Sequence, residues 1–187
     1  MQPISRIAVL HSDYLLDLPD ACEKMAGFAD LLAKRFSDDP IGFAVAFGDA
    51  IAGVGGKEGT NANKVLQAFG NRNWTPTQFG VGPTTGPGNT PTQQDLAYPG
   101  AFQPQFRDSL HPAEDQSHHF AAFVELGAVT GSALVTDQYA YFLDRNPRNE
   151  GDIRLGSMGG LLGALLGDGE VSVSDAGKWI REFICNH

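Results

Sequence analysis

Histidines and carboxylates gather in residues 111–125, directly before and inside an apolar run. If a helix begins near Asp115, then Asp115 and His119 are one turn apart and share a face, while His118 and Glu125 share a neighbouring face. A carboxylate bonded to one nitrogen of an imidazole fixes its tautomer and leaves the other nitrogen ready to take a proton or bind a metal. These four side chains are therefore our candidate catalytic residues.

A divalent metal ion is a second interpretation of the same segment. His111, Glu114 and Asp152 carry side chains that could join His118 as ligands. Their spacing matches no diagnostic motif, such as two histidines four positions apart on a helix. A third interpretation involves no chemistry: the aspartate at the helix start caps it, and the second of the paired histidines is a hydrogen-bonded packing residue.

Two functions fit this pattern. The first is a small soluble hydrolase that uses histidine–carboxylate acid/base or metal-assisted chemistry, with a long loop covering its pocket. The alternative is a non-enzymatic helical binding or interaction module, in which aromatic residues of that loop form the partner surface. Titration of His119 separates the two, because an acid/base histidine is open to solvent and a packing histidine is not.

The stretch "KEGTNANKVLQAFGNRNWTPTQFGVG", residues 57–82, resembles the active-site start of phage-type lysozymes, where Glu-Gly follows a helix and Trp-Thr and Gly-x-Gly lie downstream. The resemblance implies a glycoside hydrolase with Glu58 as general acid. Glycoside hydrolysis normally takes two carboxylates, and Asn71 and Asn73 lie where the resemblance leads us to expect the second one. A lysozyme-like activity is therefore the third hypothesis.

Composition limits the partners. A chain of 187 residues suits one domain, and we expect a single helical domain over residues 1–187. The 22 acidic and 13 basic residues give a net charge of -9. Because phosphate binding needs clustered Lys and Arg, a nucleic-acid partner is not expected.

Cys22 and Cys185 are too few for a disulfide framework and too far apart to form a zinc site alone. Reduced core cysteines are the common outcome, and one bridge joining the ends of the chain is the alternative if the protein is exported. Residues 1–20 lack a cationic start followed by a long apolar run, so we expect a cytoplasmic protein. The apolar residues 120–143 are interrupted by Glu125 and Asp137, which favours a buried helix over a membrane span.

Apolar spacing and capping residues predict an all-α fold of about six helices. They are expected near residues 18–36, 40–53, 61–70, 115–144, 152–166 and 174–183. The last of them should carry Trp179, Ile180 and Phe183 inward.

Two further features concern packing. Residues 75–104 hold five Gly and six Pro, which predicts a long ordered loop, 71–111 in its widest bounds, packed on the helices through its aromatic residues. Glycines in the helix expected at 152–166 form a stripe nearly free of side chains, from Gly156 to Gly163. We expect the helix at 115–144 to cross it at close range there.

Overall fold

The computed structural model describes residues 12–52, 102–106, 116–143 and 150–186. Its α-helices are α2 (Ser12–Asp17), α3 (Ala21–Ala33), α4 (Pro40–Ala52), α7 (Gln116–Thr130), α8 (Ala133–Leu143), α9 (Glu150–Gly167) and α10 (Ala176–Phe183). Two short 3-10 helices, η2 (Pro104–Phe106) and η3 (Val173–Asp175), join them. Within these ranges there is no strand beyond one isolated bridge, and the all-α prediction is confirmed.

Several predictions of local structure fall outside the described ranges. The helix expected at 61–70 and the loop from 71 to 101 belong to this group, as does its end at 107–111. The expected ordered packing of the loop is therefore tested only at residues 102–106, where Phe102 and Phe106 are buried.

Helix starts follow the chemistry of their caps. The carboxylate of Asp39 accepts a hydrogen bond from the backbone N–H of Gly42 at 2.8 Å, and Pro40 is the first residue of α4, as predicted. The carboxylate of Asp20 accepts from the N–H of Glu23 at 2.9 Å and begins α3 at residue 21. The expected start near residue 18 was wrong, because Asp20 supplies the better cap and places Pro19 outside the helix.

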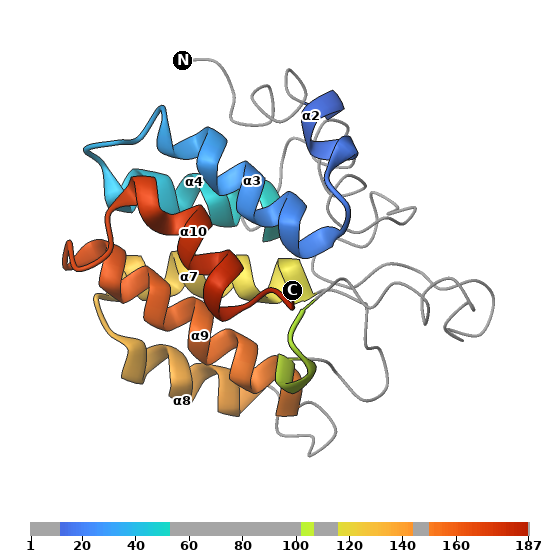
Figure 1. Ribbon diagram of the computed structural model, residues 1–187. Helices are drawn as coiled ribbons and strands as arrows, with labels where there is room; N and C mark the ends of the chain where they lie inside the picture. The colour runs from blue at the N-terminus through green and yellow to red at the C-terminus, as the bar shows by residue number, and fades with distance from the viewer. Residues whose placement is uncertain (1–11, 53–101, 107–115, 144–149, 187) are drawn as a thin grey trace.

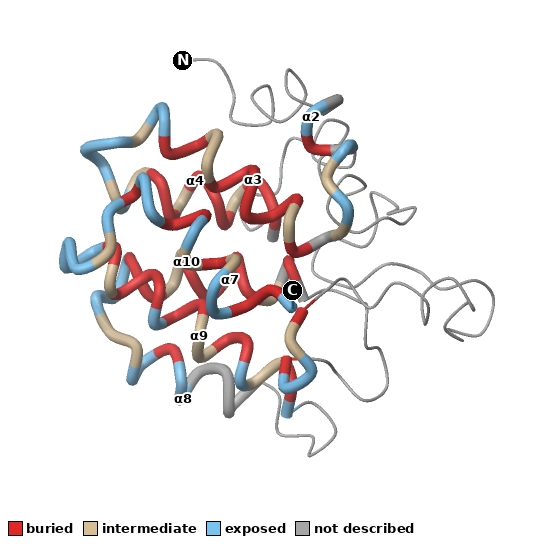
Figure 2. The backbone as a smooth tube through the Cα atoms, in the orientation of Figure 1, coloured by how far each residue is buried: buried red, intermediate tan, exposed pale blue. Residues whose placement is uncertain are grey.

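Helix α7 is central. It lies between α4 and α9 in Figure 1, and buried residues line all three helices in Figure 2. Aromatic rings join α7 to the upper helices: Phe47 stacks on Phe43 and Phe28, with ring centroids 5.9 and 6.4 Å apart, and meets Phe120 edge-on at 6.5 Å. These contacts bury the apolar faces of α3, α4 and α7 together.

Glycines bring the backbones of α7 and α9 into contact, as the sequence predicted. A β-carbon at Gly159 would lie 2.5 Å from the carbonyl oxygen of Phe120, and one at Gly163 would collide with the carbonyl oxygen of Val124. Successive contacts advance in the same direction along both helices, since His119 lies beside Gly156 and Ala128 lies beside the end of α9. The two helices therefore run parallel.

The single helix expected over 115–144 was wrong. Gly131 adopts a left-handed conformation with φ +61°, and its N–H bonds the carbonyl oxygen of Gly127 at 2.9 Å, which ends α7. Ser132 then begins α8, because its hydroxyl accepts from the N–H of Val135 at 3.3 Å. The break lets Thr136 of α8 pack directly on Gly160 of α9.

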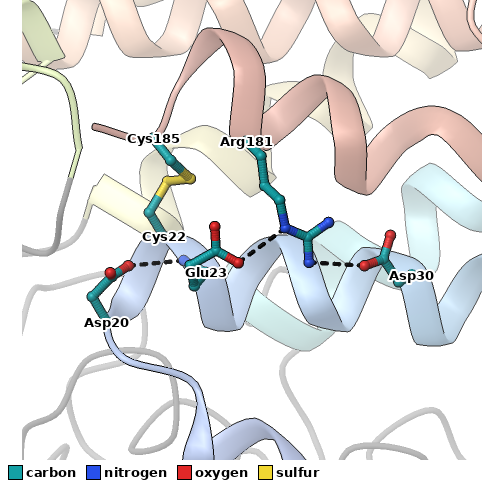
Figure 3. A network of polar contacts seen from close by, with 6 residues as sticks. All are labelled: Asp20, Cys22, Glu23, Asp30, Arg181 and Cys185. Carbon is teal, nitrogen blue, oxygen red and sulfur yellow. Dashed lines mark hydrogen bonds and ion pairs between the residues drawn. A yellow bond between two sulfur atoms is a disulfide. The ribbon is translucent and has the colours of Figure 1, made fainter. Parts of the chain in front are cut away.

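Two ion pairs made by one arginine hold helix α10 against α3. The guanidinium of Arg181 donates to Glu23 and to Asp30, both at 2.9 Å, as Figure 3 shows. Ile180 is buried as predicted and Trp179 is partly buried against the core, whereas Phe183 is 42% exposed, with its ring tilted against that of Trp179 at 4.9 Å between centroids. The inward prediction for Phe183 was wrong because α3 meets the other side of α10.

A disulfide ties α3 to the end of the chain. Cys22 and Cys185 are both buried, and the bridge joins residues 163 positions apart (Figure 3). Phe102 forms an antiparallel bridge with Cys185, and the N–H of Gln103 bonds the carbonyl oxygen of Ile184 at 2.9 Å. The covalent link therefore also holds residues 102–106 against the core.

The membrane prediction can be tested on the described helices. None of them combines the length and the apolar character that crossing a bilayer requires.

The glycine contact gives the first testable prediction. Gly163→Ala should lower the free energy of unfolding by about 1–3 kcal/mol, because the added methyl group meets backbone, which cannot rotate away. Chemical denaturation measures the change. Gly167→Ala is the matched control: a β-carbon there would lie 3.5 Å from the nearest atom, so stability should hold. Equal stability of both variants and the wild type would contradict the close approach.

The disulfide gives the second prediction. Reduction should lower the free energy of unfolding by about 2–4 kcal/mol, since the bridge closes most of the chain into one loop. Urea unfolding with and without a phosphine reductant measures the difference. The double variant Cys22→Ser, Cys185→Ser should not respond to the reductant. Alkylation of both thiols in the native, unreduced protein would refute the bridge.

Candidate functional site

His119 lies where α7 crosses α9. Its ring is half-buried, lies 4.9 Å from the ring of Phe123 between centroids, and has a buried Nε2. A β-carbon at Gly156 would lie only 3.1 Å from that nitrogen. The missing side chain of Gly156 therefore makes the room that the imidazole occupies, and the helix crossing fixes the orientation of the ring.

Asp152 belongs to the same region of α9. It precedes Gly156 by one helical turn and so projects from the same face of the helix, the face that His119 contacts. It also lies in the first turn of α9, where the helix dipole favours a negative charge. From the sequence, Asp152 was predicted only as a metal ligand, because its position beside α7 becomes visible only in the tertiary structure.

Other candidates cannot be placed. Asp115, His111, Glu114 and the lysozyme-like Glu58 lie outside the described residues, and His118 is part of α7 but its side chain is not described. The expected pairing of Asp115 with His119 stays a prediction, and so does the metal site. Among the side chains that are described, no three His, Cys, Asp or Glu groups converge as metal ligands would.

Glu125 occupies the opposite environment on α7. It faces α4, where its Oε2 is buried against Gly48, and no donor among the described residues lies within hydrogen-bonding distance of that oxygen. Burial, together with the negative charge of Asp49, raises the pKa of Glu125 to about 7. Near neutral pH this carboxyl is therefore about half protonated.

Asp49 was not a candidate in the sequence. It is the only ionisable residue of α4, and an isolated acid in an otherwise apolar helix is the signal that could have drawn attention to it. Its negative charge acts on Glu125 across the contact between α4 and α7. The structure thus adds a carboxylate pair to the candidate residues.

The candidates on α7 form two groups. His119 contacts α9 beside Gly156, while Glu125 contacts α4 beside Gly48. Glu125 lies six positions after His119, which turns their side chains about 120° apart around the helix. The two catalytic candidates whose side chains the structure describes, His119 and Glu125, therefore do not share one site.

Comparisons with protein-family models, curated proteins and solved structures give no significant match for this chain. The functional argument therefore depends on the geometry of these two groups.

The protonation of Glu125 gives the third prediction. Because its pKa is about 7 when folded and 4.5 as a free side chain, the folded state holds a proton that the unfolded state has released between these values. Stability should fall as pH rises from 4.5 to 7; the full shift corresponds to about 3 kcal/mol, and because the side chain is partly exposed, solvent screening should reduce the loss to about 1 kcal/mol. Glu125→Gln should remove most of this dependence and stabilise the protein at pH 8, as thermal unfolding across pH would measure. A wild-type slope of the opposite sign would contradict the assignment.

Proposed function

We propose that the protein is a small hydrolase in which His119 of α7 is the general acid/base and Asp152 of α9 its carboxylate partner. The observation that carries the proposal is the fit of the imidazole into the space beside Gly156, on the helix face that also bears Asp152. A carboxylate near Nε2 orients the ring and stabilises its protonated form. Nδ1 then accepts a proton from the attacking water and returns it to the leaving group.

The proposal departs from the sequence in one residue. The carboxylate expected from the sequence was that of Asp115, whereas Asp152 now has structural support for a place on the face that His119 contacts. A divalent metal held by Asp152 and His118, with His111 or Glu114, remains the metal-assisted version of the same proposal.

A non-enzymatic interaction module is the second candidate, and a specific observation favours it. The turn between α7 and α8 carries large apolar side chains in water, with Val129 61% and Leu134 67% exposed and Val135 beside them. Apolar groups gathered at one turn are typical of surfaces that bind another protein. In this version His119 only packs between α7 and α9.

The compartment in which the protein acts is also a proposal. Disulfides persist in oxidising compartments and are rare in the cytoplasm. The buried bridge between Cys22 and Cys185 therefore favours an exported protein over the cytoplasmic one expected from the sequence.

The fourth prediction tests the hydrolase. The purified chain should hydrolyse at least one of p-nitrophenyl acetate, p-nitrophenyl phosphate, bis-p-nitrophenyl phosphate and casein. His119→Gln should lower that rate about 100-fold or more and Asp152→Asn at least about tenfold, because general acid/base catalysis contributes at this scale. Each variant is checked for an unchanged helical circular dichroism spectrum.

Glu150→Gln is the matched control. Glu150 is an exposed residue of the same helix turn, where it pairs with Arg154 at 3.0 Å, so its loss should leave the rate unchanged. A wild-type protein inactive on the whole panel, or a fully active His119→Gln variant, would favour the interaction module instead.

A further inference from the structure

We propose that Glu125 and Asp49 form a proton-operated latch between α7 and α4. When the Glu125 carboxyl is protonated, it stays packed against Gly48, and α4 packs closely on α7. Without the proton, two negative charges face each other at the edge of an apolar contact, and Glu125 must turn outward to water. The latch is independent of the proposed hydrolase, because His119 contacts the other side of α7.

The geometry makes the Glu125 side chain part of the helix contact. A β-carbon at Gly48 would collide with Oε2 of Glu125 and would lie 2.7 Å from its Cβ. It would also lie 3.2 Å from the carbonyl oxygen of Ala121. The carboxyl therefore lies along α4, in space that exists because residue 48 has no side chain. An outward turn would leave that space unfilled and weaken the contact.

The charges around the latch favour the same response. From α4 the one ionisable group is Asp49, and its negative charge opposes ionisation of Glu125. On α7 itself, His118 lies seven positions earlier, and its side chain is outside the described part of the structure.

Charged groups on the other neighbouring helices are engaged elsewhere. On α3, Glu23 and Asp30 bind α10, and Lys24 lies beside Asp20. Asp137 of α8 is exposed. The charged residues of α9 lie across α7 from Glu125, namely Glu150, Asp152 and Arg154. No described cation therefore offsets the negative pair.

The consequence concerns α4 alone. Helix α4 is held to α7 by aromatic contacts at Phe47 and by the Glu125 contact one residue further on. Beyond the His119 contact at Gly156, α9 meets α7 at Gly159 and Gly163 through backbone and apolar atoms, with no ionisable side chain between them. Raising the pH should thus loosen α4 while α9 stays packed.

Hydrogen exchange of the full-length protein at pH 5.5 and 8.0, corrected for intrinsic exchange rates, tests the latch. Amides of α4 should lose protection by roughly tenfold or more at the higher pH, and amides of α9 from Gly159 onward, away from His119, should keep theirs. Glu125→Gln should give the same α4 protection at both values. Asp49→Asn should show a smaller loss, because the repelling charge is gone while burial of Glu125 remains.

Each result decides the proposal. Unchanged wild-type protection of α4, equal loss in α9 from Gly159 onward, or a Glu125→Gln variant that still responds to pH would overturn the latch. If the glutamine variant fails to fold, Glu125→Met gives the same test with an apolar side chain of similar length, and a response to pH in that variant would equally refute it.

Discussion

The contact between the backbones of α7 and α9 is the constraint on which the rest of the molecule depends. Helix axes come this close only where side chains are absent, and Gly159 and Gly163 supply those positions. Once α9 is fixed there, α7 can present its other side to α4, and the aromatic cluster around Phe47 closes the core. The same close approach leaves the space beside Gly156 that the ring of His119 occupies.

Helix α7 consequently carries two polar side chains in unlike surroundings. His119 meets the glycine-rich α9 on the face of that helix that also bears Asp152. Glu125 meets an apolar helix with a second acid, which disfavours a negative charge on the carboxyl. One rigid helix thus carries both side chains, about 120° apart around its axis.

The sequence predicts the local features well because they depend on near neighbours. Pro40 with Asp39 indicates the start of α4, and the glycine stripe of α9 indicates a close helix contact. It fails at Gly131, where the apolar pattern continues across a break made by the left-handed conformation of Gly131 and the cap at Ser132. For the candidate site, periodicity gives the face on which His119 lies, but not which helix covers it. Asp152 and Asp49 become candidate residues only through contacts between helices that are distant in the chain.

The disulfide also changes what a cut in the chain would mean. A protease that cleaves once anywhere between Cys22 and Cys185 leaves two fragments that remain a single covalent molecule. Held together in this way, the fragments meet at a high effective concentration, which favours their staying docked as in the intact protein. The helices beside the bridge, α3 and α10, are further joined by Arg181. In an environment rich in proteases, a nick would thus alter the connectivity of this protein without dismantling it.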